Sequence, residues 1–292
     1  MGGLLRIVFS IIPCRTVLCK KGGQLAFAVA GVYNEADFGP VRAKEEGEMD
    51  LTNLALIVPV TLCASYIQSV TGFGFGIFAM MFLPSLMLYT EANVLSSTLS
   101  LFTSLSIAWL MRRQIHWKNI LFPLAGCLVA TYAAVAFVKS QENDTLMLLL
   151  GAALFLLSLY FFFFSGKIRI RPTWYAGLIA GLFSGILGGL FSIGGPPVVI
   201  YFLQSEEDSD HYMATLSAYF VFSGIINVVT KVAAGFFTGG VWIGLLVGGV
   251  GMVIGSFVGK HTREKTKPDT IRKLVYGFMA VSGAVHVITA LV

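Results

Sequence analysis

Two glycine-rich runs carry the chemistry of this sequence. The first is Gly72-Phe73-Gly74-Phe75-Gly76, and the second is Ser192-Ile193-Gly194-Gly195-Pro196-Pro197. Glycine has no Cβ, so a solute can approach the backbone closely, and proline suits the first turn of a helix. A helix that begins after such a run presents unpaired N–H groups and the positive end of its dipole to an anion. The runs therefore predict two anion-binding breaks, with new helices beginning near Gly76 and Pro196.

Polar side chains near both breaks complete a candidate substrate site. The candidate substrate-binding residues are Gln68, Ser69, Thr71, Gly72, Gly74, Gly76, Ser192, Gly194, Gly195, Pro196, Asn93, Thr98, Thr215 and Asn227, with Ser97 and Ser217 as further polar residues on the same helices. No carboxylate lies inside an apolar stretch as an obvious cation site, which favours an anion as the ligand. The absence of a His/Asp/Glu cluster from these stretches argues against a metal site. We expect no metal, cofactor or catalytic residue.

Three residues have both a structural and a functional interpretation. Lys231 ends one apolar stretch, where it either snorkels to the membrane interface or draws anions to the site. His286 in the last stretch is a packing residue or a proton relay. The hydroxyl of Ser192 either bonds a carbonyl of its own helix or contributes to the site.

The elements that must position these residues are apolar and long. The 292 residues are 56% apolar and 12% charged, with a mean hydropathy of +0.81, whereas soluble domains have about 25% charged residues. Residues 51–90 and 172–205 contain no charged residue, and each has a glycine run near its middle. A bilayer core of about 30 Å needs about 20 helical residues, so each stretch is too long for one crossing. Six more stretches have the length of one crossing: residues 92–111, 119–138, 145–166, 211–230, 232–259 and 274–292. The sequence thus predicts an all-α, polytopic membrane protein with 8–10 helical segments.

The loop charges favour a helix–turn–helix in the long stretches. Of the 14 basic residues after residue 50, 12 lie in the loops at 112–118, 167–171 and 260–273. The positive-inside rule places all three loops in the cytoplasm, which is consistent only if residues 172–205 form a pair of helices. The net charge of +5 is confined to such loops, so we expect no nucleic-acid partner.

A repeat relates the two halves of the chain. Gly72 and Gly189 are 117 residues apart, as are Thr98 and Thr215. We therefore predict a non-membrane, disordered tail over 1–50 and two inverted transmembrane repeats of about five segments, over 51–166 and 167–292. Glycines every fourth residue predict helix-packing stripes instead of site residues. The stripes are Gly177, Gly181, Gly185 and Gly189, and Gly251, Gly255 and Gly259, with Gly248 beside them.

The segment Ser184–Pro197 resembles the signature of the sulfite exporter TauE/SafE permeases. Gln68–Gly76, together with Pro84, is a weaker copy that lacks the Gly-Gly pair. The resemblance covers residues 51–292 and implies transport of sulfite, sulfonates or other small organic anions across a bacterial inner membrane.

Three classes of function follow from these features. The leading hypothesis is a secondary transporter of a small anion that works by alternating access, with the anion and the lipid bilayer as its partners and no enzymatic activity. The alternatives are a passive anion channel and an intramembrane serine hydrolase that uses Ser192 and His286. A homo-oligomer is compatible with each of them.

Overall fold

The computed structural model describes residues 15–16, 29–30, 51–164, 171–206, 208–263, 275, 277, 279–280 and 282–284. The chain forms two compact units, Met1–Glu48 and Met49–Val292. In the first unit, strands β1 (Arg15–Thr16) and β2 (Val29–Ala30) pair antiparallel. The expectations of a disordered tail and of a span over 274–292, with His286, fall almost entirely outside the described residues.

The described part of the second unit is helical. Its elements are α2 (Leu51–Thr71), α3 (Phe75–Phe82), the 3-10 helix η1 (Leu83–Ser85), α4 (Tyr89–Leu110), the 3-10 helix η2 (Arg112–Gln114), α5 (Trp117–Lys139), α6 (Asn143–Phe164), α7 (Trp174–Phe191), α8 (Gly195–Ser205), α9 (Ser209–Ala233) and α10 (Gly239–Thr262). Seven of the described helices are long and apolar enough to cross a membrane: α2, α4, α5, α6, α7, α9 and α10. The protein is a multi-pass integral membrane protein, as its composition indicated.

Both long apolar stretches are broken helices, which confirms the helix–turn–helix prediction. The first chain reversal uses a left-handed backbone at Gly72 (φ +85°) and Gly74 (φ +103°), where glycine avoids the penalty of a Cβ. The second reversal uses Ser192 (φ +59°). The new helices begin at Phe75 and Gly195, within two residues of the predicted starts.

At the two breaks, corresponding helix ends are 120 residues apart, so the predicted pairing of Gly72 with Gly189 is wrong. Helices α2 and α7 end at Thr71 and Phe191, and the residues before α3 and α8 are Gly74 and Gly194. Gly189 lies within α7, and the position that corresponds to Gly72 is Ser192.

Contacts between helix ends define the two ends of the bundle. At one end, which we call the basic end, Arg263 after α10 contacts Met111 after α4 and Asp210 in the first turn of α9. At the opposite end, the N–H of Tyr89 in α4 donates to Asn143 in α6, and Thr238 before α10 donates to Glu91. The loops around residues 112–118 and 263 thus share one end, as the positive-inside argument required.

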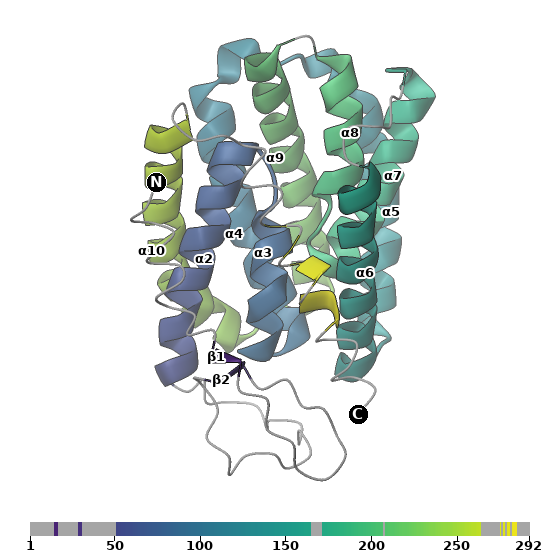
Figure 1. Cartoon of the computed structure of the whole chain (residues 1–292). Helices are drawn as coiled ribbons and strands as arrows, with labels where there is room; N and C mark the ends of the chain where they lie inside the picture. Colours follow the sequence, from purple (N-terminus) through teal and green to yellow (C-terminus); the bar gives the residue numbers. More distant parts are fainter. Residues whose placement is uncertain are drawn as a thin grey trace. The chain divides into compact units, whose positions relative to one another are not determined.

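The two broken helices enter the bundle from opposite ends (Figure 1). At the opposite end, Asn53 at the start of α2 donates to the carbonyl of Leu86 just after η1, so α2 and α3 form a hairpin that returns to the same end. At the basic end, Trp174 at the start of α7 packs on Phe122 of α5. Glu206, which follows α8, also contacts His116 and Asn119 at the start of α5 at this end.

Glycine stripes hold each long broken helix against a helix of the other half, which confirms the packing interpretation. In α7, a Cβ at Gly181 would overlap the carbonyl of Pro123 in α5, and Gly185 packs on Cys127 in the same way. In α10, a Cβ at Gly255 would overlap the carbonyl of Leu62 in α2. Small residues at four-residue spacing allow this close backbone approach in membranes.

Candidate functional site

The two breaks touch each other in the interior of the bundle. A Cβ at Gly76, in the first turn of α3, would overlap the carbonyl oxygen of Ser192 in the second break. A Cβ at Gly195 would lie 3.2 Å from the Phe73 ring of the first break. The glycines thus allow two chain reversals to occupy one small volume.

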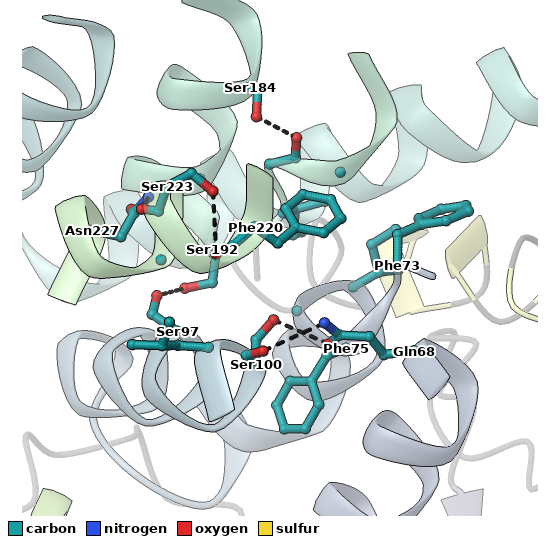
Figure 2. A pocket seen from close by; sticks show the side chains of 18 of the residues that line it. Gln68, Phe73, Phe75, Ser97, Ser100, Ser184, Ser192, Phe220, Ser223 and Asn227 are labelled. Carbon is teal, nitrogen blue, oxygen red and sulfur yellow. Dashed lines mark hydrogen bonds between the residues drawn. The ribbon is translucent and has the colours of Figure 1, made fainter. Parts of the chain in front are cut away.

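A cavity lies at this contact (Figure 2). The space inside it that the centre of a water molecule can reach measures about 60 Å³. About 10–15 Å³ of such space is enough to hold one water. It is therefore large enough for a small oxyanion. Its lining combines residues of both breaks with residues of α4, α5 and α9: Gln68, Phe73, Gly74, Phe75, Gly76, Ile77, Ser97, Ser100, Leu101, Cys127, Ser184, Gly188, Ser192, Ile193, Gly194, Gly195, Phe220, Ser223, Gly224 and Asn227.

Neutral side chains form the hydrogen bonds beside the first break. The Gln68 amide donates to the Ser104 hydroxyl over 2.6 Å, and its Oε1 accepts from Ser100 over 3.1 Å. Gln68 and Ser100 face each other on one side of the cavity (Figure 2). The amide is thereby fixed in one orientation by two residues of α4.

A lysine side chain forms hydrogen bonds at the second break. Lys231 of α9 is fully buried, and its Nζ donates to Oδ1 of Asn93 and to the hydroxyl of Ser97, both over 2.6 Å. The Ser192 hydroxyl, at 3.2 Å, and the Gly188 carbonyl, at 3.3 Å, complete its surroundings. Ser97 and Ser192 are themselves joined over 2.6 Å (Figure 2). Both serines line the cavity, whereas Lys231 is outside its lining.

The snorkelling interpretation of Lys231 is therefore wrong. Although the residue lies in the last turn of α9, its side chain points inward to α4 and α7, and none of it is exposed. Sequence reasoning left Lys231 out of the candidate site. Its spacing was the available signal, because Lys231 follows Asn227 by four residues and residues at this spacing share one helix face.

Asn93 ties the second break to α4. Its amide nitrogen donates to the Leu190 carbonyl over 2.6 Å, while its oxygen accepts from Lys231 and from the Ser192 hydroxyl. The hydroxyl of Tyr89, one turn earlier, donates to the same Leu190 carbonyl. The carbonyls that end α7 are thus capped by side chains of the first half of the protein.

Asn227 lines the cavity with an unsatisfied acceptor. Its amide nitrogen donates to the carbonyl of Ser223 over 2.9 Å, whereas its Oδ1 is buried and has no hydrogen-bond partner among the described residues. A buried acceptor without a partner is costly, and such groups in native proteins are frequently tied to function.

Half of the predicted substrate-binding residues line the cavity: Gln68, Gly74, Gly76, Ser192, Gly194, Gly195 and Asn227. Four others support the breaks without lining it. Thr71 donates within the first break to the Phe73 carbonyl, Gly72 lies against Met213, Pro196 is buried in the first turn of α8, and Asn93 holds Lys231. The hydroxyl of Ser192 bonds α4 rather than its own helix.

The structure does not bring the remaining three to the cavity. Ser69 packs on Gly259 of α10, and Thr98 donates to the Val94 carbonyl of its own helix. Thr215 accepts from the N–H of His116 at the basic end. Ser217 is buried but lies outside the lining as well.

Comparison with known proteins identifies the family. Residues 57–285 match the family model described as Sulfite exporter TauE/SafE. The chain belongs to the TauE/SafE family. A protein of Cupriavidus necator named "Probable sulfite/organosulfonate exporter TauE" is 24% identical over 226 residues, which cover 75% of this chain and 88% of that protein. No solved structure matches the chain.

Proposed function

We propose that this TauE/SafE protein exports a small anion, such as sulfite or an organosulfonate, across a bacterial inner membrane through the cavity between its two breaks. Membership of an exporter family and the name of the Cupriavidus necator relative support transport as the activity. The observation that carries the assignment to this cavity is Lys231, a fully buried lysine whose amino group donates to two serine hydroxyls of the lining.

The architecture supports alternating access as the mechanism. The two broken helices enter from opposite ends and meet at the cavity, so each forms one wall of the route to its own end. Inverted repeats arrange transporter sites in this manner. On this proposal, α2 to α6 form one repeat, and the second repeat begins at α7 with the opposite orientation in the membrane.

Flux measurements on purified protein in liposomes test the proposal. Wild-type protein should accumulate labelled sulfite or methanesulfonate against an unlabelled pool, with saturation and counterflow. Lys231→Met should lower this flux at least tenfold, because the site loses its positive charge. Lys260→Met is the matched control, since Lys260 is exposed near the end of α10, and its flux should equal that of wild type.

The same preparation separates the alternative functions. Large unitary currents in place of counterflow would indicate a channel. Labelling of Ser192 by a serine-hydrolase probe would indicate an enzyme. Wild-type flux in Lys231→Met would show that anions pass elsewhere.

A further inference from the structure

The charge around the cavity is unbalanced. Lys231 contacts four oxygen atoms that all belong to neutral groups. The acidic residues that the structure places on or beside the helices of the site do not reach the cavity. Glu91 contacts Thr238 at the opposite end, Glu206 contacts His116 and Asp210 contacts Arg263 at the basic end, and Asp208, just before α9, is exposed. No carboxylate among the described residues lines the cavity or contacts Lys231.

The surroundings of Lys231 fit a charged ammonium group. Such a group has three donors and no acceptor, and the Asn93 Oδ1 and Gly188 carbonyl oxygens beside it can only accept. The Gly188 carbonyl belongs to the last turn of α7, whose dipole offsets part of the charge. A buried cation with only this compensation is costly in a membrane. An anion in the adjacent cavity would supply the missing charge.

From this balance we propose that the cavity selects its substrate by net charge, and that it takes oxyanions of charge −1 in preference to zwitterions and dianions. The inference rests on the proposed function and specifies its substrate class. A monoanion neutralises Lys231 through the Ser97 and Ser192 hydroxyls. A zwitterion brings a second cation to a cavity without a carboxylate. A dianion brings one negative charge more than Lys231 neutralises, and only the partial positive charges at the first turns of α3 and α8 offset it.

The other wall of the cavity indicates where the rest of the substrate lies. Phe73 and Phe75 of the first break and Phe220 of α9 line the cavity (Figure 2), and the rings of Phe73 and Phe220 lie next to Gly195. Hydroxyls on one side and rings on the other suit a sulfonate with a short apolar tail, and the volume also admits hydrogensulfite.

A series of two-carbon sulfonates tests the inference, because its members share one skeleton and differ in the terminal group. Ethanesulfonate and 2-hydroxyethanesulfonate carry one negative charge, 2-aminoethanesulfonate is a zwitterion, and sulfoacetate is a dianion. Their binding to purified wild-type protein at neutral pH would be measured by competition with labelled ethanesulfonate. We expect the two monoanions to bind within a few-fold of each other, and the other two at least tenfold more weakly. Equal binding of the zwitterion or the dianion would overturn the inference.

Two variants test whether Lys231 is responsible for the preference between sulfonates of different net charge. Lys231→Arg keeps the charge and should keep the preference at least partly, whereas Lys231→Met should bring the ratio of ethanesulfonate to 2-aminoethanesulfonate affinity close to one. Lys260→Met should retain the wild-type ratio. If Lys231→Met does not fold, the wild-type series and Lys231→Arg still decide whether the cavity selects its substrate by net charge. Absence of binding and flux for every anion would refute the proposed function itself, while transport of all four sulfonates at equal rates would refute the charge rule alone.

Discussion

The carbonyl oxygen of Ser192 lies directly against the Cα of Gly76, so the two breaks of this protein share one contact. The second break supplies the carbonyl, and the first supplies a residue without a side chain to receive it. This contact forms part of the cavity wall, since both residues line the cavity. Any side chain at position 76 must therefore move one break relative to the other.

Gly76→Ala tests this relationship. The added Cβ would overlap the Ser192 carbonyl, and overpacking of this kind typically costs about 1–3 kcal/mol. We expect a lower melting temperature and a loss of anion flux of at least tenfold. Gly249→Ala in α10 is the control, because a Cβ at Gly249 would meet no atom within 4 Å. Wild-type flux in Gly76→Ala would show that the contact between the breaks is not needed for transport.

Asn227→Leu separates function from stability. The substitution removes the buried Oδ1 that has no partner among the described residues, along with one hydrogen bond to the Ser223 carbonyl. Removal of an unsatisfied acceptor offsets the lost bond, so the melting temperature should stay close to that of wild type or rise. Flux should fall several-fold, because a cavity-lining polar group is lost. A large drop in melting temperature would show that Asn227 is structural.

The contacts of Glu206 predict that it acts as a latch, a contact that keeps the basic end of the protein closed. Its buried carboxylate accepts from Asn119 over 2.9 Å and pairs with His116 over 2.6 Å, which joins the end of α8 to the start of α5. Glu206→Ala should weaken closure at this end. The measurement is labelling of Cys127, a buried thiol that lines the cavity, by a maleimide in a background without Cys14, Cys19 and Cys63.

We expect labelling of Cys127 to be several-fold faster in Glu206→Ala than in the parent protein. Glu142→Ala, which removes an exposed acidic residue between α5 and α6, should leave the rate unchanged. Equal rates in all three proteins would exclude a latch at Glu206.

The glycine stripes predict losses of stability away from the cavity. Gly181→Ala and Gly255→Ala would each place a Cβ on a carbonyl of the neighbouring helix, and each should cost about 1–3 kcal/mol. The loss should appear as a lower melting temperature in detergent, with little change in anion affinity for the protein that remains folded. Gly249→Ala again provides the unaffected reference. Melting temperatures equal to that of Gly249→Ala would show that α7 and α5, and α10 and α2, can move apart at little cost in stability.

The breaks could be predicted from the sequence because chain length and glycine content constrain them directly. An apolar stretch of 40 residues cannot cross a bilayer once, and the left-handed backbone at Gly72 and Gly74 needs glycine. The offset of 117 residues was wrong at the breaks because it followed matching residue types, such as Thr98 and Thr215, whereas the helices that lead into the two breaks end 120 residues apart.

Lys231 could not be placed from the sequence. A lysine in the last turn of a membrane helix can reach the interface or the interior, and the choice depends on how α9 is rotated against α4 and α7. That rotation is fixed by contacts between residues more than 100 positions apart, such as Lys231 with Asn93. Thr98 and Thr215 lie outside the cavity lining for the same reason, since a polar side chain on a helix of the site can still face its own backbone or a loop.

The glycine stripes also determine which parts can move as units. Helix α2 lies on α10 and α7 lies on α5, so the long arm of each hairpin is fastened to the half of the chain that it does not belong to. A rocking motion that divided the protein between its two halves would have to separate both of these closely packed interfaces at once. Under the proposed alternating access, the boundary between the moving bodies would therefore run across the halves, so that each body contains helices from both. Helices α3 and α8, which carry no such stripe, would be the segments that shift between the bodies when the cavity opens to the other side.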